Sequence, residues 1–254
     1  MQRFRVFGYL FATLMLNAGC VAVHAGKAAP TMAKSEPLFD GADLVGWTGY
    51  LEKTGRNADG KLRLGDVFQV DRASGILHVD GKGVPFGYLR TIKDYTNFKL
   101  HVEWRWLEAS PTNDSGVSFR LTGGGADQVR GMFYEVQTAE VEGFSPGDLI
   151  IYGYDKASFK TDPARISPWG STLDGYRGLS WKGALRKVIV ETEKPAGQWN
   201  SYDIVVDDDH ISVWLNGTLV NEATGAQVIP GGISLQVEGA PIDFRNILIA
   251  PIDR

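Results

Sequence analysis

Residues 113–138, NDSGVSFRLTGGGADQVRGMFYEVQT, decide the fold of this chain. The stretch holds two segments, SGVSFRL and MFYEVQT, in which apolar and polar side chains alternate, and a Gly-rich connection joins them. Successive side chains of a strand point to opposite faces. We therefore expect two strands, with Ser118 and Arg120 on the polar face of the first and Glu135 and Gln137 on that of the second. A displayed face of this kind is the candidate site.

The same alternation recurs on both sides of this stretch. Residues 97–106, NFKLHVEWRW, alternate over ten positions and place Glu103 and Arg105 opposite a run of large apolar residues. In residues 210–215, HISVWL, the pattern assigns Ser212 and Trp214 to the outward face. These segments predict further strands that each bury one face.

Near the C-terminus, residues 232–239, GISLQVEG, continue the pattern and direct Ser234, Gln236 and Glu238 outward. Shorter strands are predicted at 67–70, 75–79, 88–91, 201–206, 219–220 and 242–249, whereas residues 52–65 look like a loop. No segment has a convincing helical period. Many antiparallel strands joined by Gly turns predict an all-β fold, a two-sheet antiparallel jelly-roll sandwich.

Residues 139–193 interrupt this regular pattern. They contain one apolar run, 148–154, that is compatible with a strand and includes Tyr152, and 187–190 is compatible with another. The remainder is rich in Gly and Pro, and long loops in compact domains are usually functional. We predict one sandwich domain over residues 37–254 with a long excursion at about 139–193.

The N-terminus has the pattern of an export signal. Arg3 and Arg5 precede a short apolar run that is too short to span a bilayer. Residues 1–25 fit a signal peptide, and a lipoprotein signal ending before Cys20 is the alternative. Residues 26–36 then look like a flexible tether. The expected location is periplasmic, or the outer membrane through a lipid anchor on Cys20.

Composition limits the possible partners. The formal net charge is −4 over 254 residues and no basic stripe is visible, which argues against nucleic acid. Cys20 is the sole cysteine, so disulfide, zinc–thiolate and cysteine-nucleophile chemistry have no residues to use. Seven Trp and nine Tyr suit both a β core and carbohydrate binding.

The outward residues suit a sugar ligand, because carboxylates and amides bind hydroxyl groups and aromatic rings stack on pyranose faces. The alternative for each is a solvated sheet face with cross-strand ion pairs. The candidates for catalysis are Glu103, Arg105, Arg120, Glu135 and Glu238. The candidates for substrate binding are Ser118, Gln137, Tyr152, Trp214 and Gln236.

Several other mechanisms lack their sequence signatures. There is no His-Glu-x-x-His and no P-loop. The Glu-x-Asp-x-x-Glu strand of jelly-roll glucanases is missing as well. No metal site and no cofactor are predicted. A divalent cation such as Ca²⁺ stays open because Asp207, Asp208 and Asp209 are consecutive, although an acidic hairpin turn explains them better.

Six short motifs occur in one order along the chain. They begin with LFDG and GW at 38–47 and YLRT with NFKLHVEWR at 88–105. NDSGV with Arg120 and YEVQ at 134–137 follow, and then KPAGQWN with WLNG at 194–217. The last is LQVEG with FRNI at 235–247. Together they resemble the bacterial 3-keto-disaccharide hydrolase family, formerly the domain of unknown function DUF1080, over roughly residues 37–252.

This resemblance implies a concanavalin A-like sandwich and an extracytoplasmic role in carbohydrate breakdown. It implies cleavage of 3-keto-glycosides that an upstream sugar 3-dehydrogenase has oxidised at C3. Glu135 or Glu103 could then act as base, Arg105 or Arg120 as oxyanion partner and Glu238 as acid. Many relatives have His where this chain has Glu238. A non-catalytic carbohydrate-binding module and a cell-envelope adaptor are the alternative functions.

Overall fold

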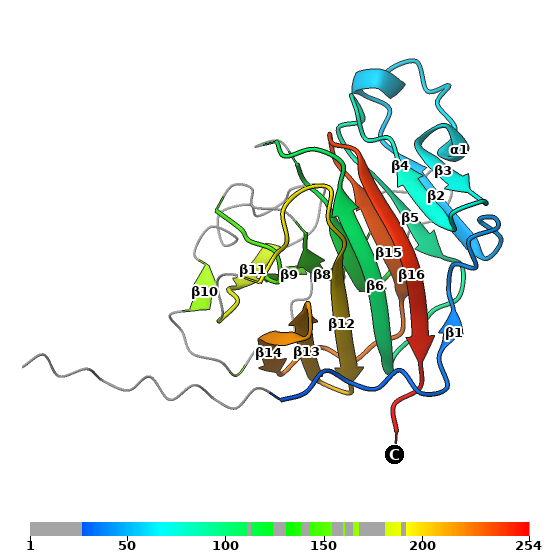
Figure 1. The fold of residues 1–254 in the computed structure, drawn as a ribbon. Coiled ribbons are helices and arrows are strands. Elements are labelled where there is room, and N and C mark those ends of the chain that lie inside the picture. Colours follow the sequence, from blue (N-terminus) through cyan, green and yellow to red (C-terminus); the bar gives the residue numbers. More distant parts are fainter. Residues whose placement is uncertain are drawn as a thin grey trace, which may run out of the picture.

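The computed structural model describes residues 27–110, 113–123, 131–138, 143–153, 160, 165–167, 181–188 and 192–253. Two antiparallel sheets of eight strands each lie face to face (Figure 1). This is the predicted all-β sandwich. The predicted leader, residues 1–25, lies outside the described residues. In the described part of the chain, no helix is long and apolar enough to cross a membrane.

Sheet A has the order β14-β13-β12-β6-β16-β4-β3, with β1 also pairing with β16. Its strands are β1 (Glu36–Pro37), β3 (Phe68–Asp71), β4 (Ile76–Val79), β6 (Phe98–Trp106), β12 (Asn200–Asp207), β13 (His210–Leu215), β14 (Thr218–Thr224) and β16 (Ile242–Ala250). Asn216 and Gly217 both have positive φ in the turn between β13 and β14, as a two-residue hairpin turn requires.

Sheet B has the order β10-β11-β9-β8-β7-β15-β5-β2. Its strands are β2 (Trp47–Leu51), β5 (Gly87–Thr91), β7 (Gly116–Leu121), β8 (Phe133–Gln137), β9 (Leu149–Tyr152), β10 (Ile166–Ser167), β11 (Trp181–Leu185) and β15 (Gly232–Val237). The two strands of the opening stretch are therefore β7 and β8, and they pair directly.

The core lies between the sheets and follows the predicted alternation. Sheet A contributes every second residue of β6, including Trp104, which is fully buried beside Tyr202. Sheet B contributes Val117 and Phe119 from β7 and Leu235 from β15. The inward sets predicted for β6, β13 and β15 are confirmed, whereas on β7 Val117 and Phe119 face the core and Leu121, also predicted to face it, does not.

The predicted excursion is partly sheet. β9 confirms the strand predicted at 148–154, and β9, β11 and β10 extend sheet B beyond β8. The strand predicted at 187–190 is not formed at 187–188, and 189–190 lie outside the described residues. The predicted loop 52–65 contains the helical turn η1 (Gly55–Asn57), and α1 (Leu64–Val67) begins at its end and includes Val67, where a strand was predicted to begin.

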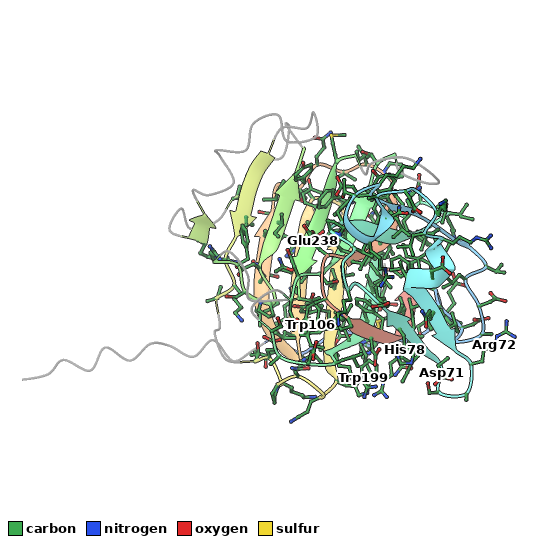
Figure 2. The ribbon with its side chains drawn as sticks, turned by 90° about the horizontal axis from the view of Figure 1, so that it is seen from above. Asp71, Arg72, His78, Trp106, Trp199 and Glu238 are labelled. Atoms are coloured by element: carbon green, nitrogen blue, oxygen red, sulfur yellow. The ribbon has the colours of Figure 1, made fainter. Side chains whose placement is uncertain are left out.

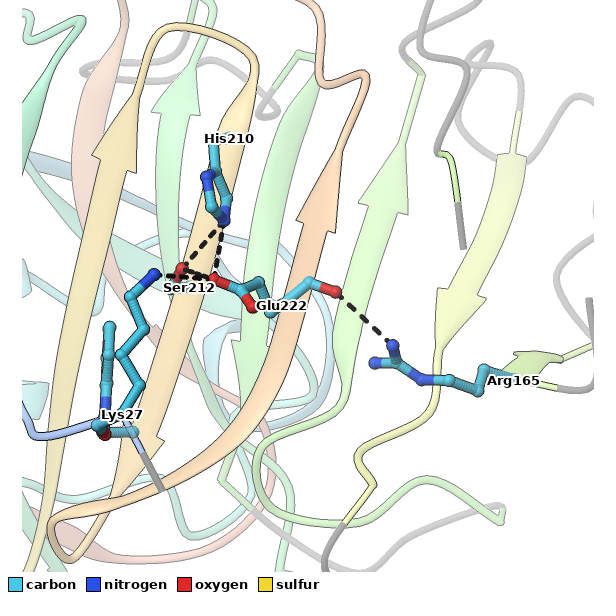
Figure 3. Close-up of polar contacts among 6 residues, drawn as sticks. Lys27, Arg165, His210, Ser212 and Glu222 are labelled. Carbon is cyan, nitrogen blue, oxygen red and sulfur yellow. Dashed lines mark hydrogen bonds and ion pairs between the residues drawn. The ribbon is translucent and has the colours of Figure 1, made fainter. Parts of the chain in front are cut away.

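The N-terminal strap, residues 27–35, crosses the outer face of sheet A and leads into β1, where a flexible tether was predicted at 26–36. The Lys27 carbonyl accepts a hydrogen bond of 2.8 Å from Trp214 Nε1, and Lys27 Nζ lies 2.9 Å from Glu222 Oε1 (Figure 3). Farther along, Lys99 Nζ donates to the Thr31 carbonyl, and β1 pairs with β16. The strap thus crosses the sheet from β13 and β14 to β16.

Arg120 does not lie on the polar face predicted for it. Ser234 and Gly232 of β15 pair with Ser118 and Leu121 of β7, so β7 has one extra residue at this point. Arg120 has a φ of 49° within this bulge. A bulge changes the face to which the following side chains point. Leu121 therefore joins the outer apolar cluster, and Arg120 turns inward.

The Arg120 guanidinium is fully buried and reaches sheet A. It donates to the carbonyl oxygens of Thr96, Asp208 and Gln227 at 2.6–3.2 Å. These bonds connect the bulge to the entrance of β6 and to the turn between β12 and β13. The position makes Arg120 a structural residue that has no access to an oxyanion on the sheet surface.

We predict that Arg120→Ala lowers the free energy of unfolding by at least about 3 kcal/mol, because buried carbonyl groups lose a charged donor. Urea unfolding measures this loss. Arg72→Ala removes an exposed arginine and is expected to change stability by less than about 0.5 kcal/mol. Equal stabilities of the two variants would contradict the structural role of Arg120.

Candidate functional site

The outer face of sheet B carries a row of polar side chains from four adjacent strands. Arg90 of β5 pairs with Ser234 of β15, which pairs with Ser118 of β7. Ser118 in turn pairs with Glu135 of β8. Ser118 and Ser234 are fully buried, and Glu135 is 3% exposed. Buried polar side chains in such a row need partners, so this face differs from an ordinary solvated sheet surface.

The Glu135 side chain packs closely over a glycine of the neighbouring strand. Ser118 Oγ donates to Glu135 Oε2 at 2.8 Å, and the rest of the side chain lies over Gly116. A Cβ atom at Gly116 would come within 2.5 Å of Glu135 Cγ and Cδ. The close approach is possible because Gly116 has no side chain, and it fixes the direction of the carboxylate.

Two amides flank Gly116. Gln137 of β8 pairs with Gly116. On the other side, Leu235 of β15 pairs with Val117, which places Gln236 beside Gly116. Gln236 Nε2 donates to Glu238 Oε2, and Gln137 Nε2 donates to Asp114 Oδ1 at 3.1 Å. Asp114 also bridges to Glu238 through the backbone. The structure therefore brings together five of the predicted residues, Ser118, Glu135, Gln137, Gln236 and Glu238.

Three buried polar atoms of this face have no hydrogen-bond partner among the described residues. They are Arg90 Nε, Ser234 Oγ and Gln236 Oε1. An unsatisfied buried donor or acceptor is costly, and native proteins usually satisfy such groups with water or ligand. Arg90 was missed by the sequence analysis, although in the strand predicted at 88–91 it alternates with Leu89, which faces the core.

An aromatic cluster completes the outer face of sheet B. It consists of Tyr50, Phe86, Tyr88, Phe133 and Tyr152, together with the aliphatic Leu121. Tyr152, a predicted binding residue, stacks on Phe133 with ring centroids 4.9 Å apart and planes at 15°. Tyr88 pairs with Gln236, which brings aromatic surface next to the amide. Like the polar row, the rings of Tyr88, Phe133 and Tyr152 are buried, so aromatic and polar groups pack side by side on this face.

The remaining predicted site residues, Glu103, Arg105 and Trp214, lie on the outer face of sheet A. Figure 2 shows Trp199 of that face and Glu238 on opposite sides of the buried Trp106. Packed sheets lie about 10 Å apart, and the two outer faces are farther from each other. The prediction that all ten residues share one site is therefore wrong. Alternation identifies outward residues but does not say which sheet a strand joins.

These residues have structural partners on sheet A. Arg245 Nε donates to Glu103 Oε2 at 2.6 Å, and Asn246 Nδ2 donates to Glu103 Oε1 at 2.8 Å. Partial burial by itself raises the pKa of Glu103, but the bonds from Asn246 and Arg245 outweigh it, so the pKa is lowered. Arg105 pairs with the buried Asp243 at 2.8 Å.

Trp214 is 2% exposed and donates its indole N–H to the strap, so its ring is not displayed for stacking. His101 is another member of this network. Its Nδ1 lies 2.7 Å from Asp203 Oδ1, and this hydrogen bond raises the pKa of His101 above its ordinary value. The outer face of sheet A is thus a network of paired charges.

Among the described residues, no group of three or more His, Cys, Asp or Glu side chains is placed to hold a metal ion. The turn Asp207–Asp209 joins β12 to β13. The site on sheet B consists of carboxylates, amides, hydroxyls and one arginine.

Two-sheet jelly-roll sandwiches of this kind occur in lectin domains. A candidate glycosyl hydrolase from Parabacteroides distasonis superposes with a TM-score of 0.53 at 21% identity, over 86% of this chain and all of the other. A second from the same organism gives 0.51 at 17% identity, over 89% of this chain and all of the other. The Bacillus licheniformis beta-glucanase gives 0.52 at 11% identity, over 86% and 97%. At these identities the likeness shows the concanavalin A-like fold.

The family follows from the sequence comparison. The family model of the 3-keto-alpha-glucoside-1,2-lyase-like domain matches residues 34–250, and the chain belongs to this family. A comparison with curated proteins gives no match. Membership in the family supports a carbohydrate-active function.

We predict that Gly116→Ala displaces the Glu135 side chain and breaks its bond to Ser118, because the new Cβ overlaps Glu135 Cγ and Cδ. The cost in stability is expected to be about 1–2 kcal/mol. A crystal structure and urea unfolding measure the two effects. Gly65→Ala, at a position with no atom within 4 Å of the added Cβ, is the matched control. If the Glu135 side chain keeps its position in Gly116→Ala, then Gly116 does not determine where the carboxylate lies.

We predict that Asp203→Asn returns the pKa of His101 towards 6.5. Because the folded-state pKa is raised, the pair stabilises the fold fully at pH below 6.5, and the effect is lost as the pH rises through the folded value. The variant should therefore lose most stability at pH 5 and little at pH 9. Proton NMR of the His101 ring and urea unfolding at both pH values check this. A deficit that grows with pH would exclude the pair as its cause.

Proposed function

We propose that this protein cleaves the glycosidic bond of 3-keto-glycosides by removing the C2 proton and eliminating the group at C1. The observation that carries the proposal is Glu135, a buried carboxylate held by Ser118 and Gly116, with Glu238 and two amides close to it. A single positioned base next to a second carboxylate suits an elimination.

The carbonyl at C3 acidifies the proton on C2. Glu135 takes this proton, and the electron pair of the C2–H bond moves into an enolate whose negative charge lies on the C3 oxygen. The enolate then expels the C1 oxygen with its bonding pair, and Glu238 in its acid form protonates the departing oxygen. The products are an enone and an alcohol or sugar. Addition of water across the new double bond returns the hydrolysis product.

The enolate oxygen needs hydrogen-bond donors where its charge develops. Arg120 cannot provide them because it is turned inward, and Arg105 lies on the other sheet. The amides of Gln137 and Gln236 each use one N–H on a neighbouring carboxylate, which leaves a second N–H for substrate. Both amides are 3% exposed, and burial strengthens such bonds by excluding water.

The biological setting of the proposal comes from the leader and the chemistry. We infer export by residues 1–25, with the protein free in the periplasm or anchored through Cys20. A substrate with a ketone at C3 requires an oxidoreductase that acts earlier on the same sugar. A carbohydrate-binding module of the same fold, or an envelope adaptor, would use the same face without turnover.

The test compares a p-nitrophenyl 3-keto-glucoside with the unoxidised glucoside. We predict that the wild type releases p-nitrophenol from the keto form alone. Glu135→Gln should lower kcat by about 100-fold or more because the base is lost. Stopped-flow absorbance and steady-state rates measure both.

Glu103→Gln is the matched control, since Glu103 is the carboxylate on the other sheet and is expected to keep the wild-type rate. Loss of activity in Glu103→Gln with activity kept in Glu135→Gln would move the site to sheet A. Sugar binding, followed by tryptophan fluorescence, without cleavage of either compound would favour the binding module.

A further inference from the structure

Two carboxylates lie opposite each other at one end of the candidate site. Asp114, which precedes β7, forms an antiparallel bridge with Glu238, which follows β15. Side chains of residues paired in this way lie on the same face of a sheet, with Cβ atoms about 5 Å apart. Both residues are half-buried, so the pair can be reached from solvent. Like charges at this distance repel each other, and such a pair binds a proton more tightly than an isolated carboxylate does.

The amide that contacts Asp114 is held at both ends. Gln137 Nε2 donates to Asp114 Oδ1 at 3.1 Å, and Gln137 Oε1 accepts from the Thr138 N–H at 2.9 Å. The same Thr138 N–H also donates to the Ser115 carbonyl. Gln137 therefore presents an N–H to Asp114, and a hydrogen bond of this kind favours the charged form of a carboxylate.

The amide that contacts Glu238 is held at one end only. Gln236 Nε2 donates to Glu238 Oε2, whereas Gln236 Oε1 has no hydrogen-bond partner among the described residues, although the side chain is only 3% exposed. A half-turn of the amide exchanges its two ends, and Oε1 can then accept a hydrogen bond from a protonated Glu238. Gln236 thus suits both the charged and the protonated form of Glu238. Of the two carboxylates, Glu238 is the one whose surroundings accept a proton.

We propose that Asp114 is a positioning residue whose fixed negative charge keeps the catalytic proton on Glu238. This assignment rests on the function proposed above, in which Glu238 gives that proton to the departing C1 oxygen. The O–H bond of Glu238 breaks, its electron pair stays on the carboxylate, and the proton joins the oxygen as the C1–O bond opens. The Gln236 amide then turns an N–H towards the new carboxylate. Asp114 stays charged throughout and acts through Glu238.

Three other charged side chains of the described residues belong to the elements around Glu238. Glu135 of β8 adds a negative charge from across β7, and Glu52 follows β2 on the far side of β5. Lys82 lies in the segment that bridges to the residue after Glu238, and it is exposed, so solvent screens its positive charge. Asp114 differs from these groups because it pairs with Glu238 directly.

The first test is the pH profile of kcat for methyl 3-keto-glucoside, measured by methanol release, because this poor leaving group needs a proton. We predict an alkaline limb where Glu238 loses its proton. Asp114→Asn should move this limb to lower pH by about one unit, which lowers the rate about tenfold above the limb. Asp114→Glu keeps the charge and should return the limb towards its wild-type position. The p-nitrophenyl compound, whose leaving group departs without a proton, should show a smaller effect.

Asp59→Asn is the matched control, because Asp59 is an exposed aspartate that pairs with Lys61 at 3.1 Å. It makes the same chemical change as Asp114→Asn and should leave both pH profiles unchanged. An alkaline limb at the same pH in the wild type and in Asp114→Asn would overturn the proposal. An equal loss of rate at every pH would overturn it too, because a merely structural residue gives that result.

Infrared spectroscopy of the free protein separates the failure of this inference from the failure of the proposed function. The C=O stretch of a protonated carboxyl group reports the Glu238 proton even if the wild type cleaves neither keto compound. This band should persist to higher pH in the wild type than in Asp114→Asn, and it should be missing in Glu238→Gln. Loss of the band at the same pH in the wild type and Asp114→Asn, or its persistence in Glu238→Gln, would overturn the proposal.

Discussion

The packing of the two sheets against each other is the constraint on which the rest of the structure depends. Each long strand gives alternate residues to the shared core, where Trp104, Phe119 and Tyr202 are fully buried. This leaves the two outer faces for all polar chemistry. The two outer faces carry different kinds of polar groups. That of sheet A is filled with paired charges and the strap, whereas that of sheet B holds buried polar groups, some of which lack partners.

Much of the fold could be predicted because side-chain alternation is a local property. The long strands β6, β7, β8, β12, β13, β15 and β16 were found where the pattern placed them. β11 and β10 were missed because they lie in a Gly- and Pro-rich stretch without alternation. The sheet to which each strand belongs is not local, since it depends on pairings between distant segments. Glu103 and Glu135 therefore looked equivalent in the sequence but lie on opposite faces.

Arg120 shows a second limit of pattern-based prediction. The period of two fails wherever a bulge adds a residue, and the φ of 49° at Arg120 has no obvious sequence signal. Arg90 was the opposite case, because its alternation with Leu89 is regular, but the strand predicted at 88–91 was too short to draw attention to it. The close packing of Glu135 over Gly116 and of Arg90 over Gly232 could not be predicted either. It depends on side chains that come from neighbouring strands.

The strap has a consequence for how the molecule can be held. Lys27 lies at β13 and β14, and Asp253 pairs with Lys99, so both ends of the described chain lie on the outer face of sheet A. A tether at either end, whether a lipid in a membrane or a linker on a solid support, would draw that face towards the supporting surface. The face with Glu135 would then point into the surrounding medium. Immobilisation by either terminus would therefore direct the outer face of sheet B away from the support.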